Sequence, residues 1–174
     1  MPIHRLRQGL RALFAFARPV DDTLAAHYLT PPEFALFKSM RRGEQLHSLN
    51  VLRAVLAQGD TPPDLAVAAL LHDVGKSRYP LAVWQKTAAV LVRAFAPAQF
   101  RRLSQRDSLG FWSRPFAVSV QHPQWSAEML AQAGASAAAI WLVAHHQDAS
   151  PNAPEQGSDR VSLLKRLQSA DDAN

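Results

Sequence analysis

The sequence of 174 residues contains no cysteine. This absence excludes disulfide bonds, thiolate metal sites and cysteine nucleophiles. A transition metal bound by this chain must therefore be held by histidine and carboxylate side chains. Apolar runs of about 18 residues, the length that a membrane-spanning helix requires, are also missing. The sequence therefore predicts no transmembrane segment.

Alternation of apolar and polar residues at a period of two, the pattern of a half-buried strand, is almost absent. Apolar residues recur instead at helical spacing, and the length suits one domain with a substantial core. We therefore expect an all-α fold, a single compact helical bundle over residues 1–174. The predicted helices span residues 31–40, 43–58, 64–74, 80–95, 97–106, 123–133, 136–146 and 158–170, and a loop is predicted at 147–157.

Several helix ends can be predicted from capping residues. Thr30-Pro31-Pro32-Glu33 and Thr61-Pro62-Pro63-Asp64 both place proline next to a capping threonine and an acidic residue three positions after it. His122-Pro123 predicts another helix start, while Gly59 and Gly134 predict helix stops. The stretch Leu65–Leu71 is apolar on every side, which predicts a helix surrounded by others.

Negative charge is scarce in the first two-thirds of the chain. Residues 1–114 carry 16 Lys and Arg against 8 Asp and Glu, whereas residues 115–174 carry 3 against 6. This excess is compatible with a solvated surface or with attraction for an anionic partner such as a phosphate ester or nucleic acid. Aromatic residues interleaved with the basic ones, as in proteins that stack on bases, are not evident, so we expect no dedicated nucleic-acid binding.

Residues 1–20 have apolar side chains at helical spacing (Ile3, Leu6, Leu10, Leu13 and Phe14). The short apolar stretch ALFAFA is bracketed by Arg11 and Arg18, which does not fit a secretory signal. We expect an amphipathic helix that packs on the domain rather than on a membrane surface, and a cytoplasmic protein.

The chain has seven histidines, of which His4 and His27 have no evident partners. The others lie on apolar helices or at their ends, as do two aspartates; the seven residues are His47, His72, Asp73, His122, His145, His146 and Asp171. Any one of them alone would be read as a hydrogen-bonded core residue. Because they lie on different predicted helices, they can converge on one site inside a bundle. A divalent cation would offset the cost of burying them there.

The stretch LLHDVGK at residues 70–76 is preceded by a histidine in EQLHSLNVLRAVL and followed by an aspartate in LLKRLQSADDAN. These motifs, over residues 43–172, resemble the HD-domain superfamily of metal-dependent phosphohydrolases, in its HD-[IV]-G-K subtype. Residues 1–42 would then be N-terminal helices packed on an HD-domain core. The resemblance implies four metal ligands, His47, His72, Asp73 and Asp171. The stretches QHPQWSAEML and AHHQD add His122, His145 and His146 as ligands of a second metal.

Two features depart from related groups. The HD-GYP group follows its His-His pair with a glutamate and a DGxGYP segment, whereas this sequence reads HHQDASPNAPEQ. Asp171 lies near the end of the sequence and is followed by Asp172, so either residue could be the ligand. Spacing from LLKRLQSA favours Asp171.

The resemblance implies a hydrolase that uses one or two divalent ions, chosen among Mn, Fe, Ni, Co, Mg and Zn. Asp73 would bridge two ions and take part in catalysis, and the metals would activate water for attack on phosphorus. Lys76 would bind a substrate phosphate or stabilise the leaving group, although a cation at a helix C-terminus can be functionally idle. The expected substrate is a nucleotide or a related small phosphoester. A regulatory domain with little catalysis and a di-iron oxygenase remain alternatives, and monoester and diester cleavage are not distinguished.

Overall fold

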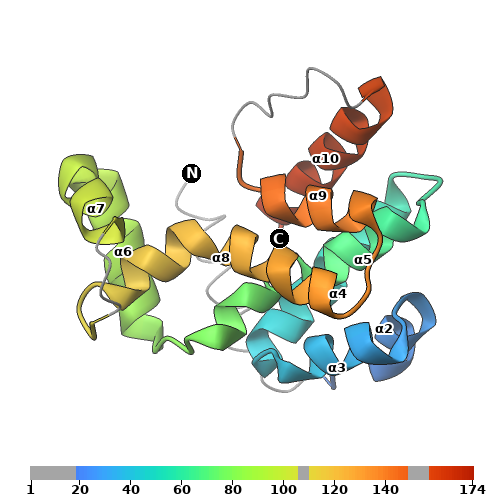
Figure 1. Ribbon diagram of the computed structural model, residues 1–174, viewed down its shortest axis with the longest axis horizontal. Helices are drawn as coiled ribbons and strands as arrows, with labels where there is room; N and C mark the ends of the chain where they lie inside the picture. Colours follow the sequence, from blue (N-terminus) through green and yellow to red (C-terminus); the bar gives the residue numbers. More distant parts are fainter. Residues whose placement is uncertain (1–18, 106–109, 149–156) are drawn as a thin grey trace.

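The computed structural model describes residues 19–105, 110–148 and 157–174 (Figure 1). The predicted N-terminal helix and most of the predicted loop at 147–157 lie outside these residues. The described parts contain helices joined by short turns and no strand, which confirms the all-α prediction. The helices are α2 Asp22–Tyr28, α3 Pro31–Ser39, α4 Arg42–Ala57, α5 Pro63–Leu71, the 3-10 helix η1 Val74–Arg78, α6 Val83–Phe95, α7 Pro97–Ser104, α8 Arg114–Gln132, α9 Ala137–His145 and α10 Gly157–Asp172.

Helix α5 lies at the centre of the fold. All residues from Leu65 to Leu71 are buried, as the unbroken apolar stretch predicts. α5 contacts α4, α9 and α10, and it also contacts the N-terminal helices α2 and α3. Ala25 and Phe37 of these N-terminal helices belong to the same hydrophobic core. The end of α5 is therefore held deep in the molecule.

The predicted helix starts are confirmed in part. At α3, the backbone N–H of Thr30 donates to the Glu33 carboxylate at 2.8 Å, which completes the capping box. At α5 the prediction is wrong, because Pro62 occupies the cap position and has no side-chain donor or acceptor. The Thr61 hydroxyl donates instead to the carbonyl of Gly59 at 2.9 Å. Gly59 ends the α4 turn with φ +117°, a conformation that favours glycine.

The prediction that a helix begins at Pro123 is wrong. Helix α8 begins at Arg114, with Pro115 in its first turn, and continues through Pro123 to Gln132. Pro123 lacks an N–H, so the Ser119 carbonyl loses its helical donor. Burial of Phe116, Trp125 and Leu130 along the same helix outweighs this local cost. His122 is consequently a mid-helix residue rather than a cap.

Helices α6 and α7 form a hairpin that packs on the N-terminal half of α8 (Figure 1), and Lys86 of α6 also pairs with Glu44 of α4. A small cluster of Ala89, Phe100 and Phe116 fixes the hairpin to α8. None of the helices in the described ranges is long and apolar enough to cross a membrane.

Candidate metal centre

The histidine and aspartate of LLHDVGK lie where α5 ends. Leu71 is the last residue of α5, and the backbone N–H of His72 still donates to the Ala68 carbonyl at 2.9 Å. Asp73 then precedes the tighter turn of η1. The side chains of His72 and Asp73 are almost completely buried. A helix end that faces solvent is thereby excluded as an explanation of this motif.

Lys76 follows in η1 rather than in a continued α-helix. Its Nζ lies 2.6 Å from Oδ2 of Asp73, and its backbone N–H donates to the Asp73 carbonyl at 3.0 Å. The 3-10 turn therefore folds the lysine back onto the aspartate. The side chain keeps 28% exposure, so it connects the buried aspartate to solvent.

Three buried histidines, His72, His122 and His146, direct Nε2 toward Asp73 and Nδ1 toward a backbone carbonyl. Nδ1 of His72 lies 3.1 Å from the Ala69 carbonyl, Nδ1 of His122 lies 2.9 Å from the Val118 carbonyl, and Nδ1 of His146 lies 2.7 Å from the Val143 carbonyl. Because a carbonyl only accepts, each neutral imidazole carries its proton on Nδ1. The lone pair of each Nε2 is then free to bind a cation. Second-shell carbonyl bonds of this kind commonly orient metal-binding histidines.

The Nε2 atoms of these histidines surround the Asp73 carboxylate. The distance to a carboxylate oxygen is 3.6 Å for His72, 3.2 Å for His122 and 3.9 Å for His146. All three Nε2 atoms are buried and make no hydrogen bond within the described part of the chain. Buried nitrogens without a partner are costly, and a divalent cation between them and Asp73 would satisfy them. The donor set therefore fits a metal.

His47 and Asp171 close the other side of the cluster. Nε2 of His47 lies 2.8 Å from Oδ1 of Asp171, and Nε2 of His72 lies 3.5 Å from the same oxygen. Asp172, in contrast, is exposed. Ligand atoms within 4.8 Å of one another form two groups, His47 with His72 and Asp73, and Asp73 with His122 and His146. Asp73 belongs to both groups, which is the arrangement expected of a bridging carboxylate.

His145 is not brought into this cluster. Its Nδ1 lies 2.6 Å from Oδ2 of Asp148, and its ring packs against Trp141 with the centroids 4.7 Å apart. Adjacent residues on a helix point about 100° apart, so a pair such as His145-His146 directs only one side chain inward. His145 remains a predicted ligand without geometric support.

Gly75 lets η1 approach α8 closely. A Cβ atom at this position would lie 2.8 Å from the backbone nitrogen of Ser126 and even closer to the carbonyl oxygen of His122. The Gly75 N–H donates to Oγ of Ser126 at 2.8 Å. Gly75 thus places His122 beside Asp73. Ser126 carries no signal in the sequence that would have marked it as part of the site.

Charged groups of the cluster shift the pKa values of Asp73, His146 and His72. Burial alone would raise the pKa of Asp73, but the charges of Lys76 and His72 outweigh it and hold that pKa well below its usual value. Burial and the charge of His72 lower the pKa of His146 to about 3. Burial also acts to lower the pKa of His72, yet the carboxylates of Asp73 and Asp171 raise it above its usual value. Asp73 therefore stays ionised although it is buried, and a buried carboxylate favours a cation.

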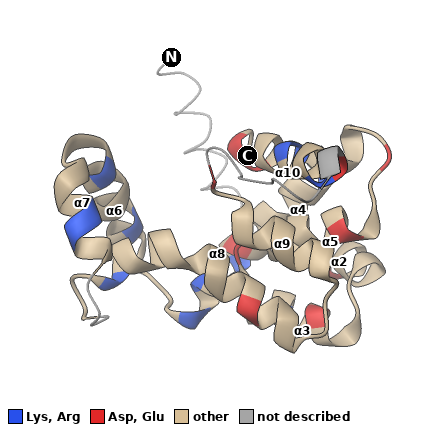
Figure 2. Ribbon diagram, turned by 45° about the horizontal axis from the view of Figure 1, so that its top comes forward, with Lys and Arg blue, Asp and Glu red and all other residues tan. Residues whose placement is uncertain are grey.

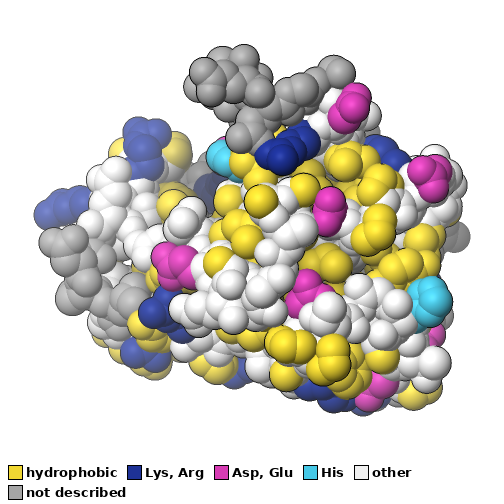
Figure 3. All heavy atoms as spheres, turned by 45° about the vertical axis from the view of Figure 1, so that its right-hand side comes forward, with side chains coloured by type: hydrophobic (Ala, Val, Ile, Leu, Met, Phe, Trp, Pro, Cys, Tyr) yellow, Lys and Arg dark blue, Asp and Glu magenta, His cyan; other side chains and the backbone are white. Residues whose placement is uncertain are grey.

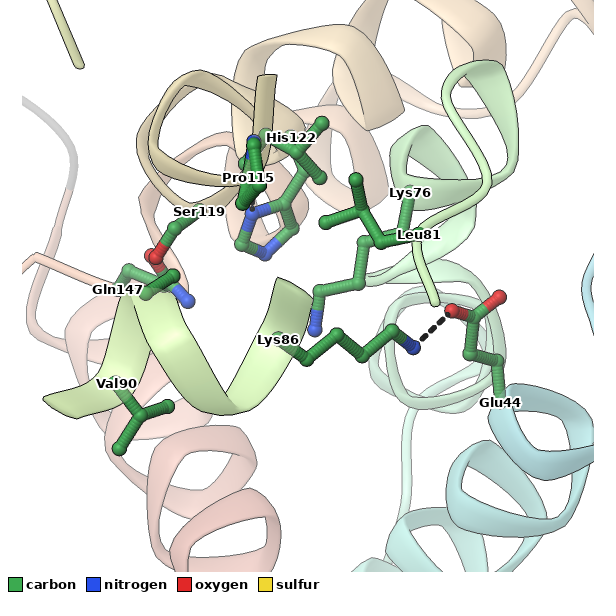
Figure 4. Close-up of a pocket in the computed structure, with 11 residues that line it drawn as sticks. Glu44, Lys76, Leu81, Lys86, Val90, Pro115, Ser119, His122 and Gln147 are labelled. Atoms are coloured by element: carbon green, nitrogen blue, oxygen red, sulfur yellow. Dashed lines mark hydrogen bonds and ion pairs between the residues drawn. The ribbon is translucent and has the colours of Figure 1, made fainter. Parts of the chain in front are cut away.

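A cavity of about 260 Å³ opens beside the second group of ligand atoms (Figure 4). His122 and Lys76 reach it from the buried cluster, and Lys86 of α6 lies opposite, 2.9 Å from a carboxylate oxygen of Glu44. Apolar side chains make most of the remaining wall: Leu81, Ala89, Val90, Pro115 and Val118. Sequence reasoning did not single out Lys86 or Glu44, because each is an ordinary charged residue on a surface helix until the fold joins them.

The sequence matches the family model of the HD domain over residues 46–173. The chain belongs to the HD domain family. This family comprises metal-dependent phosphohydrolases, in agreement with the His and Asp cluster described above. The match covers nearly the same residues as the predicted HD-domain core, 43–172. The chain matches no curated protein and no solved structure.

Proposed function

We propose that this HD domain is a phosphohydrolase that cleaves a nucleotide or a related small phosphoester. The observation that carries the proposal is the convergence of three buried Nε2 atoms, none hydrogen-bonded in the described ranges, on one carboxylate. Structural histidines rarely leave three such nitrogens together without partners. A metal centre accounts for all three.

Two divalent ions would be held by two groups of ligands that share Asp73. His47, His72 and Asp171 would complete the first site, and His122 and His146 the second. Candidate ions are Mn, Fe, Ni, Co, Mg and Zn, because only nitrogen and oxygen donors are present. When bound, such ions supply Lewis-acid polarisation of the phosphoryl group and a lowered pKa for water.

The protein groups around the cavity would bind and orient the substrate. Lys76 would leave Asp73, once cations neutralise that carboxylate, and bind a phosphoryl oxygen. Lys86 would hold a second anionic oxygen at the opposite wall of the cavity. The apolar wall would exclude water and pack against the organic part of the ester. A cavity of this size suits a compact ester better than a dinucleotide.

Metal analysis combined with a phosphoester screen tests the proposal. The full chain is expected to retain metal on purification and to hydrolyse at least one nucleotide or sugar phosphate with added Mn, Ni or Mg. Asp73→Asn, which keeps the side-chain shape, should lose both metal and turnover. The exposed substitution Asp172→Asn is the matched control.

Each outcome has a distinct meaning. Equally low metal content in the wild type and in Asp73→Asn, with no turnover in either, would overturn the proposal. Metal content that depends on Asp73, without turnover of any ester, would replace it with a metal-binding regulatory domain. Iron with visible colour after aerobic purification would favour oxygenase chemistry.

A further inference from the structure

The apolar side chains exposed on this protein are concentrated in one region. Every large apolar side chain with high exposure in the described ranges lies between residues 83 and 120. Five belong to α6 and two to the turn before α8; together they form what we call the α6 apolar surface: Val83, Trp84, Val90, Leu91, Phe95, Phe111 and Trp112. Val83 is 81% exposed, Phe95 83% and Trp112 74%. Exposed apolar groups at this density mark an interaction surface.

The aromatic members of this surface contact one another. Trp84 lies 5.9 Å from Phe111 and 6.4 Å from Trp112, measured between ring centroids, and Phe111 lies 5.3 Å from Trp112. The turn before α8 is thereby joined to α6. The side chains at 84, 91 and 95 follow helical spacing, so they form one continuous stripe along the helix.

Cationic residues border the α6 apolar surface at its Val90 edge, across α6 from Trp84, Leu91 and Phe95. Lys86 and Arg93 are placed three or four residues from Val90, which makes them its neighbours on the helix surface. Arg101 and Arg102 of α7 are exposed. From Val74 to Ala127 the described residues include seven Lys and Arg and no Asp or Glu. Lys and Arg gather on the α6 and α7 side of the molecule in Figure 2, while most visible Asp and Glu lie over the right-hand part of Figure 3.

The combination of exposed apolar groups with cations favours some ligands of the α6 apolar surface over others. A second copy of the chain would bring the same cationic surface against itself in a symmetric dimer, which is repulsive. Residues 1–18 carry four arginines and no acidic residue, so they are repelled as well. Single-stranded nucleic acid uses aromatic faces for stacking, but Val83, Val90 and Leu91 cannot stack on bases. An anionic lipid surface accepts both the aliphatic groups and the cations, and tryptophan is favoured at such interfaces.

We propose that the α6 apolar surface docks this protein on anionic lipid bilayers. The stripe would enter the interface while Arg93, Arg101 and Arg102 contact acidic headgroups. Because Lys86 and Val90 also line the cavity, the opening of the cavity would lie close to the bilayer. The docking is tested separately from the hydrolase proposal, because Trp84, Phe95, Arg101 and Arg102 lie outside both the metal cluster and the cavity wall.

Flotation of the full chain with lipid vesicles tests this docking. The protein should bind vesicles of phosphatidylcholine with 30% phosphatidylglycerol at 0.1 M salt and bind pure phosphatidylcholine far more weakly. Binding should fall in 0.5 M salt, because cations near an anionic surface are screened. The double substitution Trp84→Ser with Phe95→Ser should abolish binding without changing helix content or metal content.

Arg101→Gln with Arg102→Gln tests the electrostatic part. This pair should weaken binding roughly thirtyfold, since each of the two cations near an acidic surface contributes about 1 kcal/mol. Lys38→Gln with Lys165→Gln removes the same charge from other exposed positions and should leave binding within a factor of two. Equal weakening by both pairs would overturn the docking surface.

Three further results would also overturn it. The first is equal binding to neutral and anionic vesicles. The second is binding to a single-stranded oligonucleotide but not to vesicles. The third is a dimer in sedimentation that the Trp84→Ser and Phe95→Ser pair dissociates, which would assign the surface to a second copy of the chain.

Discussion

Gly75 donates its backbone N–H to Oγ of Ser126 at 2.8 Å, and this bond joins the turn after Asp73 to the helix that carries His122. The two residues are 51 positions apart in sequence and both are buried. Nε2 of His122 comes within 3.2 Å of Asp73 only because the backbone at Gly75 has no side chain in the way. The second group of ligands therefore depends on a residue that binds no metal.

Gly75→Ala should separate η1 from α8. We expect a loss of about 1–3 kcal/mol in the free energy of unfolding, as in other overpacked sites. The second metal should also bind at least tenfold more weakly, because His122 moves relative to Asp73. Urea unfolding and metal titration measure the two effects. Gly43→Ala, where an added Cβ contacts nothing, is the control and should be neutral or slightly stabilising.

Asp171→Asn and Asp172→Asn distinguish the two neighbouring aspartates. Asp171 contacts His47 and His72, whereas Asp172 is exposed. We expect Asp171→Asn to lower the metal content of the purified protein by about one ion per chain. Asp172→Asn should retain the wild-type content. Elemental analysis settles the assignment, and the reverse pattern would contradict the geometry.

His146→Gln and His145→Gln make a second matched pair. Loss of His146 removes a buried Nε2 from the second group of ligands, so the affinity for the second ion should fall by roughly 10–100-fold or more. Loss of His145 removes an exposed contact with Asp148 and should change that affinity by less than about threefold. Comparable losses in both variants, measured by calorimetry, would mean that His145 turns inward to bind metal.

The low pKa of His146 makes the metal-free chain sensitive to acid. This pKa is about 3 in the folded state, so the unfolded chain binds the proton more readily between pH 6.5 and 3. Stability therefore falls as pH decreases through that window, by at most about 1.4 kcal/mol per pH unit from this group. Urea unfolding at pH 6.5 and 5.0 with chelator present should show a weaker pH dependence for His146→Gln. His27→Gln, at an exposed position on α2, should behave like the wild type.

The contribution of His72 to stability depends on pH in the opposite direction. Its pKa is raised in the folded state, so its contribution is fully present below pH 6.5 and is lost as pH increases through the raised value. The two residues therefore act in different pH ranges, His146 below pH 6.5 and His72 above it. The comparison between wild type and His146→Gln isolates the contribution of one residue.

Lys76→Met should impair substrate binding more than folding. The methionine keeps the length of the side chain but removes the charge that would contact phosphate. On the hydrolysed ester we expect kcat/KM to fall by about 10²–10³-fold, and inhibition by inorganic phosphate to weaken in parallel. Lys165→Met, an exposed lysine on α10, is the control. Unchanged phosphate inhibition in Lys76→Met would exclude a phosphate contact.

The sequence was sufficient to predict most of the helices, although not α2, and to name candidate ligands. Periodicity and the unbroken apolar stretch Leu65–Leu71 identified α5 as central, because burial leaves a clear compositional signal. The start of α8 was mispredicted since proline usually begins a helix, and only the packing of residues on both sides of Pro123 keeps it inside one. Burial of these side chains in the tertiary structure outweighs the preference of proline for the start of a helix.

Side-chain direction was the part that the sequence did not contain. Nothing in the sequence distinguishes His145 from His146 as a ligand. Only the rotation of α9 about its axis decides which of the two faces Asp73. The residues that line the cavity could not be predicted from the sequence for a related reason. Lys86 and Glu44 are 42 residues apart, and no local pattern links them.

The contact between His47 and Asp171 spans 124 positions of the sequence. Closing so long a loop costs chain entropy, and contacts of this range form slowly. A cation bound by both residues would hold α4 and α10 together. Removal of metal should then loosen α10 first, with faster amide exchange in residues 159–171 than in α5. The occupancy of the site and the order of the C-terminal helix would thus be a single equilibrium.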